Sequence, residues 1–129
     1  MTKINDQVKA FFGECRVGVF ATAGDAPNVI AVAFKRIDDD GNIVICDVFM
    51  QESLKNLVKN PKVAFAFYNE QTLEGYQVKG TATYTTDAEP VAAGNAMTQK
   101  AGLTTKGIVT LVPEEVLVLT PGPDVGKTL

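Results

Sequence analysis

The feature that most constrains the fold is a series of short β-type segments separated by short connections. Six stretches are rich in β-branched and aromatic residues: residues 17–23, 28–37, 43–48, 63–68, 76–85 and 108–119. Most gaps between them are rich in turn-forming residues. A parallel crossover needs about a dozen residues or more, so most of these connections are too short for one. The sequence therefore predicts a closed or nearly closed antiparallel barrel with peripheral helices.

One predicted helix lies in the middle of the chain, between the third and fourth predicted strands. Leu54, Leu57 and Val58 have the i, i+3, i+4 spacing of an apolar stripe that faces a core. Ser53 is suited to cap its start, and the Asn-Pro pair at 60–61 disfavours its continuation. Backbone N–H groups at the start of a helix are free to hold an anion. This segment is therefore the first candidate for a binding site.

Two further helices are predicted nearer the ends of the chain. The first follows Thr2, ends at Gly13 and carries apolar residues at helical spacing, namely Ile4, Val8, Phe11 and Phe12. The second is capped by Asp87 and runs to Gly102. Because the second is rich in alanine and only weakly apolar, we expect it to lie outside the barrel.

In three of the predicted strands, particular residues predict how the strand packs or where its pairing is irregular. Residues 28–37 are apolar on both faces, so we expect both faces to be covered. Gly80 predicts a bulge or a close approach of another backbone. An interruption is predicted near residues 113–115, and the Pro- and Gly-rich residues 120–129 are expected to form an extended tail.

The composition excludes several kinds of chemistry. The chain has no histidine, which removes Ser-His-Asp catalysis, Cys-His catalysis and imidazole-ligated zinc. Cys15 and Cys46 lack CxxC spacing and are expected to be buried free thiols. The three carboxylates at 38–40 indicate a solvated turn, because the alternating ligands and distal glutamate of a calcium loop are missing. We predict no metal site, so any chemistry is expected to come from a bound organic cofactor.

Length and charge limit the partners. At 129 residues we expect one domain, residues 1–129, large enough to bury a core. A net charge of -3 with scattered Lys and Arg argues against nucleic acid or an anionic membrane surface as the partner. No stretch has the apolar length that spans a bilayer, and residues 1–6 look like a native start rather than a targeting sequence. We therefore expect a cytoplasmic protein.

Six segments of the chain, taken in order, form a pattern. They are residues 18–23 (GVFATA), 27–29 (PNV), 38–41 (DDDG), 55–63 (KNLVKNPKV), 75–82 (GYQVKGTA) and 121–127 (PGPDVGK). Their order and spacing span nearly the whole chain and resemble the FMN-binding split-barrel family related to pyridoxamine 5'-phosphate oxidase. The resemblance implies a mainly β fold, a six-stranded antiparallel split β-barrel (Greek key) with short peripheral helices. It also implies a homodimer with FMN bound in a groove at the interface.

The resemblance also suggests which residues hold the cofactor. The predicted cofactor-binding residues are Ala31, Val32, Ala33, Lys35, Asp47, Val48, Ser53 and Asn56. The first four belong to the strand that is expected to lie along the flavin ring and the ribityl chain. The strand end at Asp47 and the start of the central helix are expected to receive the ring edge and the phosphate. No catalytic residue is predicted.

The chain departs from the family pattern at Glu52 and Ser53, where a basic residue followed by Lys, Thr or Ser is usual. Ser53 keeps a hydroxyl donor, but a carboxylate ~5 Å from a phosphate costs about 3 kcal/mol at an effective dielectric of ~20. Either Glu52 points away and another residue supplies the positive charge, or FMN is bound weakly or not at all. The candidates for that charge are Lys35, Arg36, Lys55 and Lys79.

Two functions remain open at this point. The first is a small FMN-binding flavoprotein, an FMN-dependent oxidoreductase or an electron carrier. It is not a true pyridoxamine phosphate oxidase, because Ile30 replaces an arginine of the oxidase and the chain has no histidine. The second is a split-barrel ligand-binding or interaction module that has lost FMN. Glu52 favours the second function, whereas Ser53 and the otherwise intact pattern favour the first.

Overall fold

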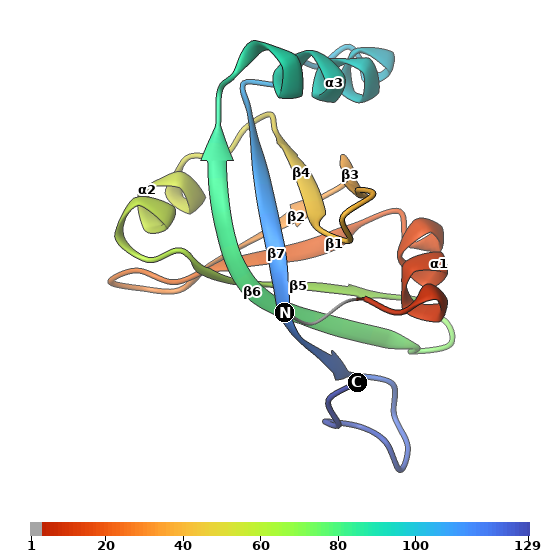
Figure 1. The fold of residues 1–129 in the computed structure, drawn as a ribbon. Coiled ribbons are helices and arrows are strands. Elements are labelled where there is room, and N and C mark those ends of the chain that lie inside the picture. The colour runs from red at the N-terminus through yellow and green to blue at the C-terminus, as the bar shows by residue number, and fades with distance from the viewer. Residues whose placement is uncertain (1–3) are drawn as a thin grey trace.

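The structure, a computed structural model, describes residues 4–129, so the predicted Thr2 start of the first helix lies outside the described residues. One curled antiparallel sheet has the strand order β2-β1-β5-β6-β7-β4-β3 (Figure 1). The strands are β1 (Gly18–Thr22), β2 (Asn28–Val32), β3 (Lys35–Ile37), β4 (Ile43–Asp47), β5 (Lys62–Tyr68), β6 (Gly75–Thr85) and β7 (Gly107–Val118). The helices are α1 (Asp6–Glu14), α2 (Glu52–Lys59) and α3 (Ala88–Thr98), with the 3-10 turn η1 (Gln99–Ala101). The predicted mainly β split barrel with short peripheral helices is confirmed.

The predicted strand at residues 28–37 is divided in two, which is why the described part of the chain forms seven strands rather than six. β2 pairs with β1, whereas β3 pairs with β4 at the opposite edge of the sheet. Between them the backbone oxygen of Phe34 accepts a hydrogen bond from the N–H of Cys46 (3.0 Å). The bend at residues 33–34 therefore carries the chain from one sheet edge to the other and closes the barrel.

The outward face of β2 is not covered, contrary to the prediction. Val32 is buried, whereas Val29 is 61% exposed and Ala31 is also exposed. β2 is an edge strand, so its outward side chains have a neighbouring strand on one side only. The continuous apolar run therefore produces an exposed apolar edge rather than a strand buried on both faces.

α1 lies at one end of the barrel (Figure 1). There its side chains join an aromatic cluster that fills the interior. Phe11 and Phe12 of α1 pack against Phe67, with ring centroids 6.2 and 5.0 Å from it. Phe65 and Tyr76 continue the cluster across β5 and β6. Edge-to-face and tilted aromatic pairs of this kind add stability beyond the burial of their surface.

The two long strands β6 and β7 meet at an irregularity beside Gly80. The register of the pair shifts between Lys79 and Gly80. A Cβ atom at Gly80 would overlap the carbonyl oxygen of Val112. Both the predicted bulge and the predicted close approach are therefore present. The predicted interruption of the last strand is an irregularity in pairing rather than a break: β7 continues through Pro113, and Glu114 is the extra residue between Pro113, opposite Gly80, and Glu115, opposite Lys79.

The three helices lie where the sequence predicts them, but some of their predicted caps and buried residues differ. α1 begins at Asp6 and is capped by Asn5, so Ile4 precedes the helix, contrary to the prediction; it ends one residue beyond Gly13. Leu54 and Leu57 of α2 pack against the core, but Val58 is 89% exposed, because this eight-residue helix meets the barrel only along its inner side. Asp87 is the residue before α3 but makes no side-chain cap. As predicted, α3 lies outside the barrel, against β4 and β7 (Figure 1).

The remaining features of the fold are the C-terminal tail, the two cysteines and the turn between β3 and β4. The predicted extended tail is wrong: residues 119–129 turn and fold back on β7, where the N–H of Val118 donates to the oxygen of Lys127 (2.9 Å). Cys15 and Cys46 are free and buried, as predicted. The side chain of Asp38 accepts hydrogen bonds within the turn that joins β3 to β4. No helix within residues 4–129 is long and apolar enough to cross a membrane.

Candidate functional site

An apolar groove lies between β2, the turn after β4 and the loop after η1. Its volume is about 250 Å³. Its walls are formed by Ile30, Ala31, Val32, Phe34, Cys46, Val48, Phe49, Met50 and Leu103. Phe49 is 77% exposed although it is large and apolar. An exposed aromatic ring in an apolar groove is typical of a surface that binds another molecule.

Larger hollows lie near α1 and the tail, with volumes of 370 to 420 Å³. They are lined by a mixture of polar and apolar side chains and contain only Ala33 and Lys35 of the predicted set. The apolar groove contains Ala31, Val32 and Val48. We therefore take the smaller groove as the candidate site.

The turn that forms one wall of the groove is held by Asp47, whose side chain is fully buried. One carboxylate oxygen accepts the backbone N–H of Met50 (2.9 Å). The other accepts the hydroxyl of Tyr84 (2.6 Å). A buried carboxylate needs such donors, because burial without them is costly. Asp47 thus fixes the path of the chain from β4 into α2, and its oxygens face the protein interior.

Tyr84 belongs to β6 and covers Gly107, where a Cβ atom would overlap its ring. Burial raises the pKa of Tyr84 to about 12, with its hydrogen bond to Asp47 and the negative charge of that carboxylate as further causes. The hydroxyl therefore remains a donor at neutral pH. Together the two residues tie the end of β4 to the middle of the sheet.

Lys106 brings a positive charge to the same turn. Its backbone N–H donates to the oxygen of Asp47 (2.7 Å). Its ammonium donates to the backbone oxygen of Met50 (3.3 Å) and lies 3.8 Å from a carboxylate oxygen of Asp47. The side chain is 49% exposed, so the charge remains accessible to solvent.

The first turn of α2 is fixed to the β1–β2 hairpin. Ser53 is 1% exposed, and its hydroxyl oxygen accepts the side-chain amide of Asn28 (3.2 Å). The amide of Asn56 donates to the hydroxyl of Thr22 (3.1 Å) and to the backbone oxygen of Ala26 (3.2 Å). Ser53 is therefore not the N-cap that its position suggested. That place belongs to Gln51, which makes no side-chain cap.

Glu52 lies on the exposed side of this turn. Its carboxylate accepts a hydrogen bond from the ammonium of Lys55 (2.9 Å), and both side chains are mostly exposed. The charge that departs from the family pattern is thus paired within α2. An exposed pair of this kind is screened by water and salt.

Lys35 and Ala33 lie apart from the groove. The ammonium of Lys35 donates to the backbone oxygen of Cys15 (2.6 Å) at the end of α1 and lies 4.1 Å from the ring centroid of Phe12. Burial lowers the pKa of Lys35. Ala33 and Lys35 line a separate hollow beside α1. The structure thus groups the predicted set as three residues in the groove, three in the turn and helix beside it, and two elsewhere.

Sequence reasoning did not single out several residues of this region. They are Phe49, Met50, Tyr84, Leu103 and Lys106. Phe49 had a usable signal, since a large apolar residue directly after a strand end is unusual in a turn. Tyr84 and Lys106 had none, because their contacts with Asp47 join residues far apart in the sequence. Among the residues the structure places, no group of acidic or cysteine side chains is arranged to hold a metal ion.

Comparison with known proteins identifies the family. The family model described as pyridoxamine 5'-phosphate oxidase matches residues 4–121. The chain belongs to the pyridoxamine 5'-phosphate oxidase family. It is also 35% identical over 128 residues to an uncharacterized protein of Methanocaldococcus jannaschii, covering 96% of this chain and 85% of that protein.

Solved structures share the fold at low sequence identity. The HupZ protein of Group A Streptococcus has a TM-score of 0.81 at 22% identity, covering 95% of this chain and 99% of that one. A putative pyridoxamine 5'-phosphate oxidase of Lactobacillus delbrueckii has a TM-score of 0.72 at 19% identity, covering 89% and 93%. An F420 reductase has a TM-score of 0.70 at 17% identity, covering 88% and 98%. At these identities the likeness establishes the fold alone.

Proposed function

We propose that this protein is a homodimeric flavoprotein that binds FMN in the apolar groove. The observation that carries the proposal is a groove lined by apolar side chains, with the exposed ring of Phe49, beside the start of α2. An isoalloxazine ring suits apolar walls and an aromatic neighbour. A phosphate suits the free N–H groups of a helix start. Members of the pyridoxamine 5'-phosphate oxidase family generally bind a flavin, which agrees with this assignment.

The residues of the groove would hold and shield the cofactor. Ala31, Val32 and Val48 would contact the ring, while Ser53 and Asn56 keep the start of α2 against the hairpin that carries β2. Bound FMN would supply transfer of a hydride or of single electrons between a donor and an acceptor. The protein would then act as an FMN-dependent oxidoreductase or as an electron carrier.

Oxidation of pyridoxamine phosphate is not part of this proposal. Ile30 lines the groove with an apolar side chain, where the oxidase pattern has an arginine. A phosphorylated substrate needs positive charge or several donors at its phosphate. The groove walls supply neither, so we expect a substrate or redox partner without a phosphate in this position.

A second copy of the chain would complete the site. Val29 exposes an apolar side chain on β2, and Ala31 of the same edge strand is exposed and lines the 250 Å³ groove. Burial of exposed apolar side chains is the main driving force for association of this kind. Light scattering coupled to size exclusion should give twice the mass of one chain. A monomer at micromolar concentration would refute the dimer.

Titration of the purified protein with FMN tests the cofactor. The proposal predicts quenching of FMN fluorescence with micromolar or tighter affinity, and a yellow protein when it is purified with its flavin. The alternative is a split-barrel binding module that has lost FMN, which Glu52 at the family's basic position favours. A colourless protein that quenches no FMN at high concentration would refute the flavoprotein and leave the alternative.

A further inference from the structure

The proposed FMN site needs a positive charge that its family position does not supply. A phosphate monoester carries between one and two negative charges at neutral pH. Glu52 stands where a basic residue is usual, and its charge is paired with Lys55. Free N–H groups at a helix start supply only a partial charge. Another side chain must therefore balance the phosphate if FMN is bound tightly.

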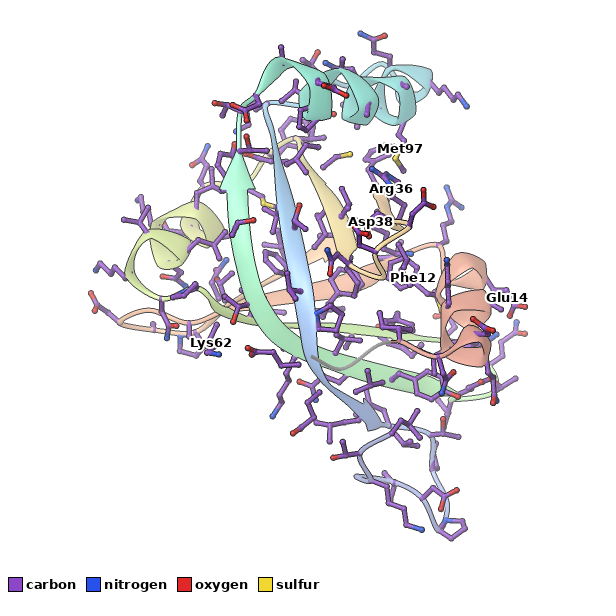
Figure 2. All side chains as sticks on the ribbon, viewed as in Figure 1. Phe12, Glu14, Arg36, Asp38, Lys62 and Met97 are labelled. Carbon is purple, nitrogen blue, oxygen red and sulfur yellow. The ribbon has the colours of Figure 1, made fainter. Side chains whose placement is uncertain are left out.

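None of the four cations considered from sequence, all within the described residues, is hydrogen-bonded to the turn before α2. Lys35 is bound to the end of α1. Arg36 lies with Asp38 beside Met97 of α3, on the side of the molecule away from α2 (Figure 2). Lys55 is paired with Glu52. Lys79 is exposed on β6, opposite Glu115 of β7.

Lys106 satisfies the requirement. Its ammonium reaches the backbone oxygen of Met50, one residue before the N-cap position of α2. It therefore lies at the turn from which the free N–H groups of the helix begin. An ammonium has three N–H donors, and one of those of Lys106 is used on Met50. The side chain is about half exposed, so a further donor can reach a ligand.

The Lys106 ammonium also forms an ion pair with a nearby buried carboxylate. Asp47 lies 3.8 Å from the Lys106 ammonium, longer than a charge-assisted hydrogen bond. Its oxygens are already bonded to Tyr84 (2.6 Å) and to the N–H of Met50 (2.9 Å). These two hydrogen bonds also stabilise the buried negative charge, so Lys106 is one of three groups that share it. Asp47 also holds the backbone of Lys106 in place through its own oxygen (2.7 Å).

From this arrangement we infer that Lys106 pairs with the FMN phosphate and makes the site select FMN over riboflavin. The inference rests on the proposed function. It assigns to the loop before β7 the charge that the family pattern places at the start of the central helix. Riboflavin carries the same ring and ribityl chain without the phosphate, so it separates the two contributions.

The test is a pair of fluorescence titrations, with FMN and with riboflavin, on wild type and variants. Lys106→Met should weaken FMN binding by about 10- to 100-fold, as expected for loss of a hydrogen-bonded charge. Its riboflavin affinity should stay within about twofold of wild type. Lys106→Arg keeps the charge and should keep the preference for FMN. The matched control is Lys79→Met, an exposed lysine on β6, which should bind both flavins as wild type does.

The outcomes separate the inference from the proposed function. Wild type that binds neither flavin refutes the flavoprotein itself. Wild type that prefers FMN, together with a Lys106→Met variant of unchanged FMN affinity, refutes the role of Lys106 and leaves the flavoprotein standing. Equal losses for both flavins would also refute it, because they indicate a disturbed groove. The melting temperature of each ligand-free variant, measured alongside, shows whether the variant is folded. If Lys106→Met does not fold, the FMN and riboflavin affinities of Lys106→Arg decide the question.

Discussion

The two ends of the barrel are built in opposite ways. At the α1 end, Phe11, Phe12 and Phe67 are buried against one another and close the interior. At the α2 end, Phe49 is exposed beside an apolar groove, and the buried charge of Asp47 holds the turn that carries it. Apolar residues at the first end are used for stability. Similar residues at the second end remain available for a ligand, so the same composition serves two purposes.

The largest effect is expected on the free energy of unfolding, from a substitution at the α1 end of the barrel. Phe67→Ala removes a fully buried ring and should lower the free energy of unfolding by about 3–5 kcal/mol. Urea unfolding followed by circular dichroism measures the change. A loss below about 1 kcal/mol would show that the cluster is loosely packed and that the two ends do not differ as described.

The partly buried hydrogen bond between Asp47 and Tyr84 should make the free energy of unfolding depend on pH in the alkaline range. The pKa of Tyr84 is raised to about 12 in the folded protein, above the ordinary value near ~10. The folded state therefore binds this proton more tightly than the unfolded state. Its stabilisation is complete below pH ~10 and is lost as pH rises toward ~12.

Urea unfolding from pH ~9 to ~11.5 tests that dependence. The free energy of unfolding should fall more steeply with pH in wild type than in Tyr84→Phe. The control is Tyr68→Phe, which alters an exposed tyrosine of β5 and should keep the wild-type slope. Equal slopes in all three proteins would mean that Tyr84 has no such linkage.

A smaller effect, on binding rather than stability, is expected from the open end. Phe49→Ala should change the free energy of unfolding by less than about 0.5 kcal/mol, because the ring is 77% exposed. FMN affinity should fall by about 3- to 10-fold through loss of an aromatic contact. Val58→Ala, at an even more exposed apolar residue outside the groove (89%), is the control and should leave FMN affinity unchanged. Unchanged FMN affinity in Phe49→Ala together with weaker FMN binding in Val58→Ala would place the flavin elsewhere.

The smallest effect is expected from the charge that departs from the family pattern. Glu52→Lys should raise FMN affinity by about two- to fivefold, because the side chain is exposed and its charge is screened. Asp25→Lys makes the same change of charge on the β1–β2 hairpin, where Asp25 pairs with Lys59, and is the control. A gain of a hundredfold would show that Glu52 faces the phosphate directly.

Much of the fold follows from local pattern. The β-rich stretches, the turns and the three helices are where the spacing of apolar and turn-forming residues predicts them. The bend at residues 33–34 could not be predicted, because the apolar run continues unchanged through it. Likewise the spacing of Val58 fits a core stripe, and only the short, one-sided contact of α2 with the barrel leaves it exposed.

The site was harder to predict than the fold, because its contacts join distant parts of the chain. The strand end at Asp47 was identified, but its bond to Tyr84 spans 37 residues and follows from the pairing of β4, β7 and β6. Lys35 was predicted to face the flavin, whereas its ammonium is held at the end of α1. Long flexible side chains such as Lys35 and Lys106 reach their partners in ways that sequence spacing does not record.

Hydrogen exchange with and without FMN gives the most direct test of the difference between the two ends. FMN should slow exchange at residues 28–34 and 47–56, which include the groove wall on β2, the turn after β4 and the start of α2. Exchange in α1, residues 6–14, should not change. Protection confined to α1 and the hollows beside it, or no protection anywhere at saturating FMN, would contradict the assignment of the groove as the flavin site.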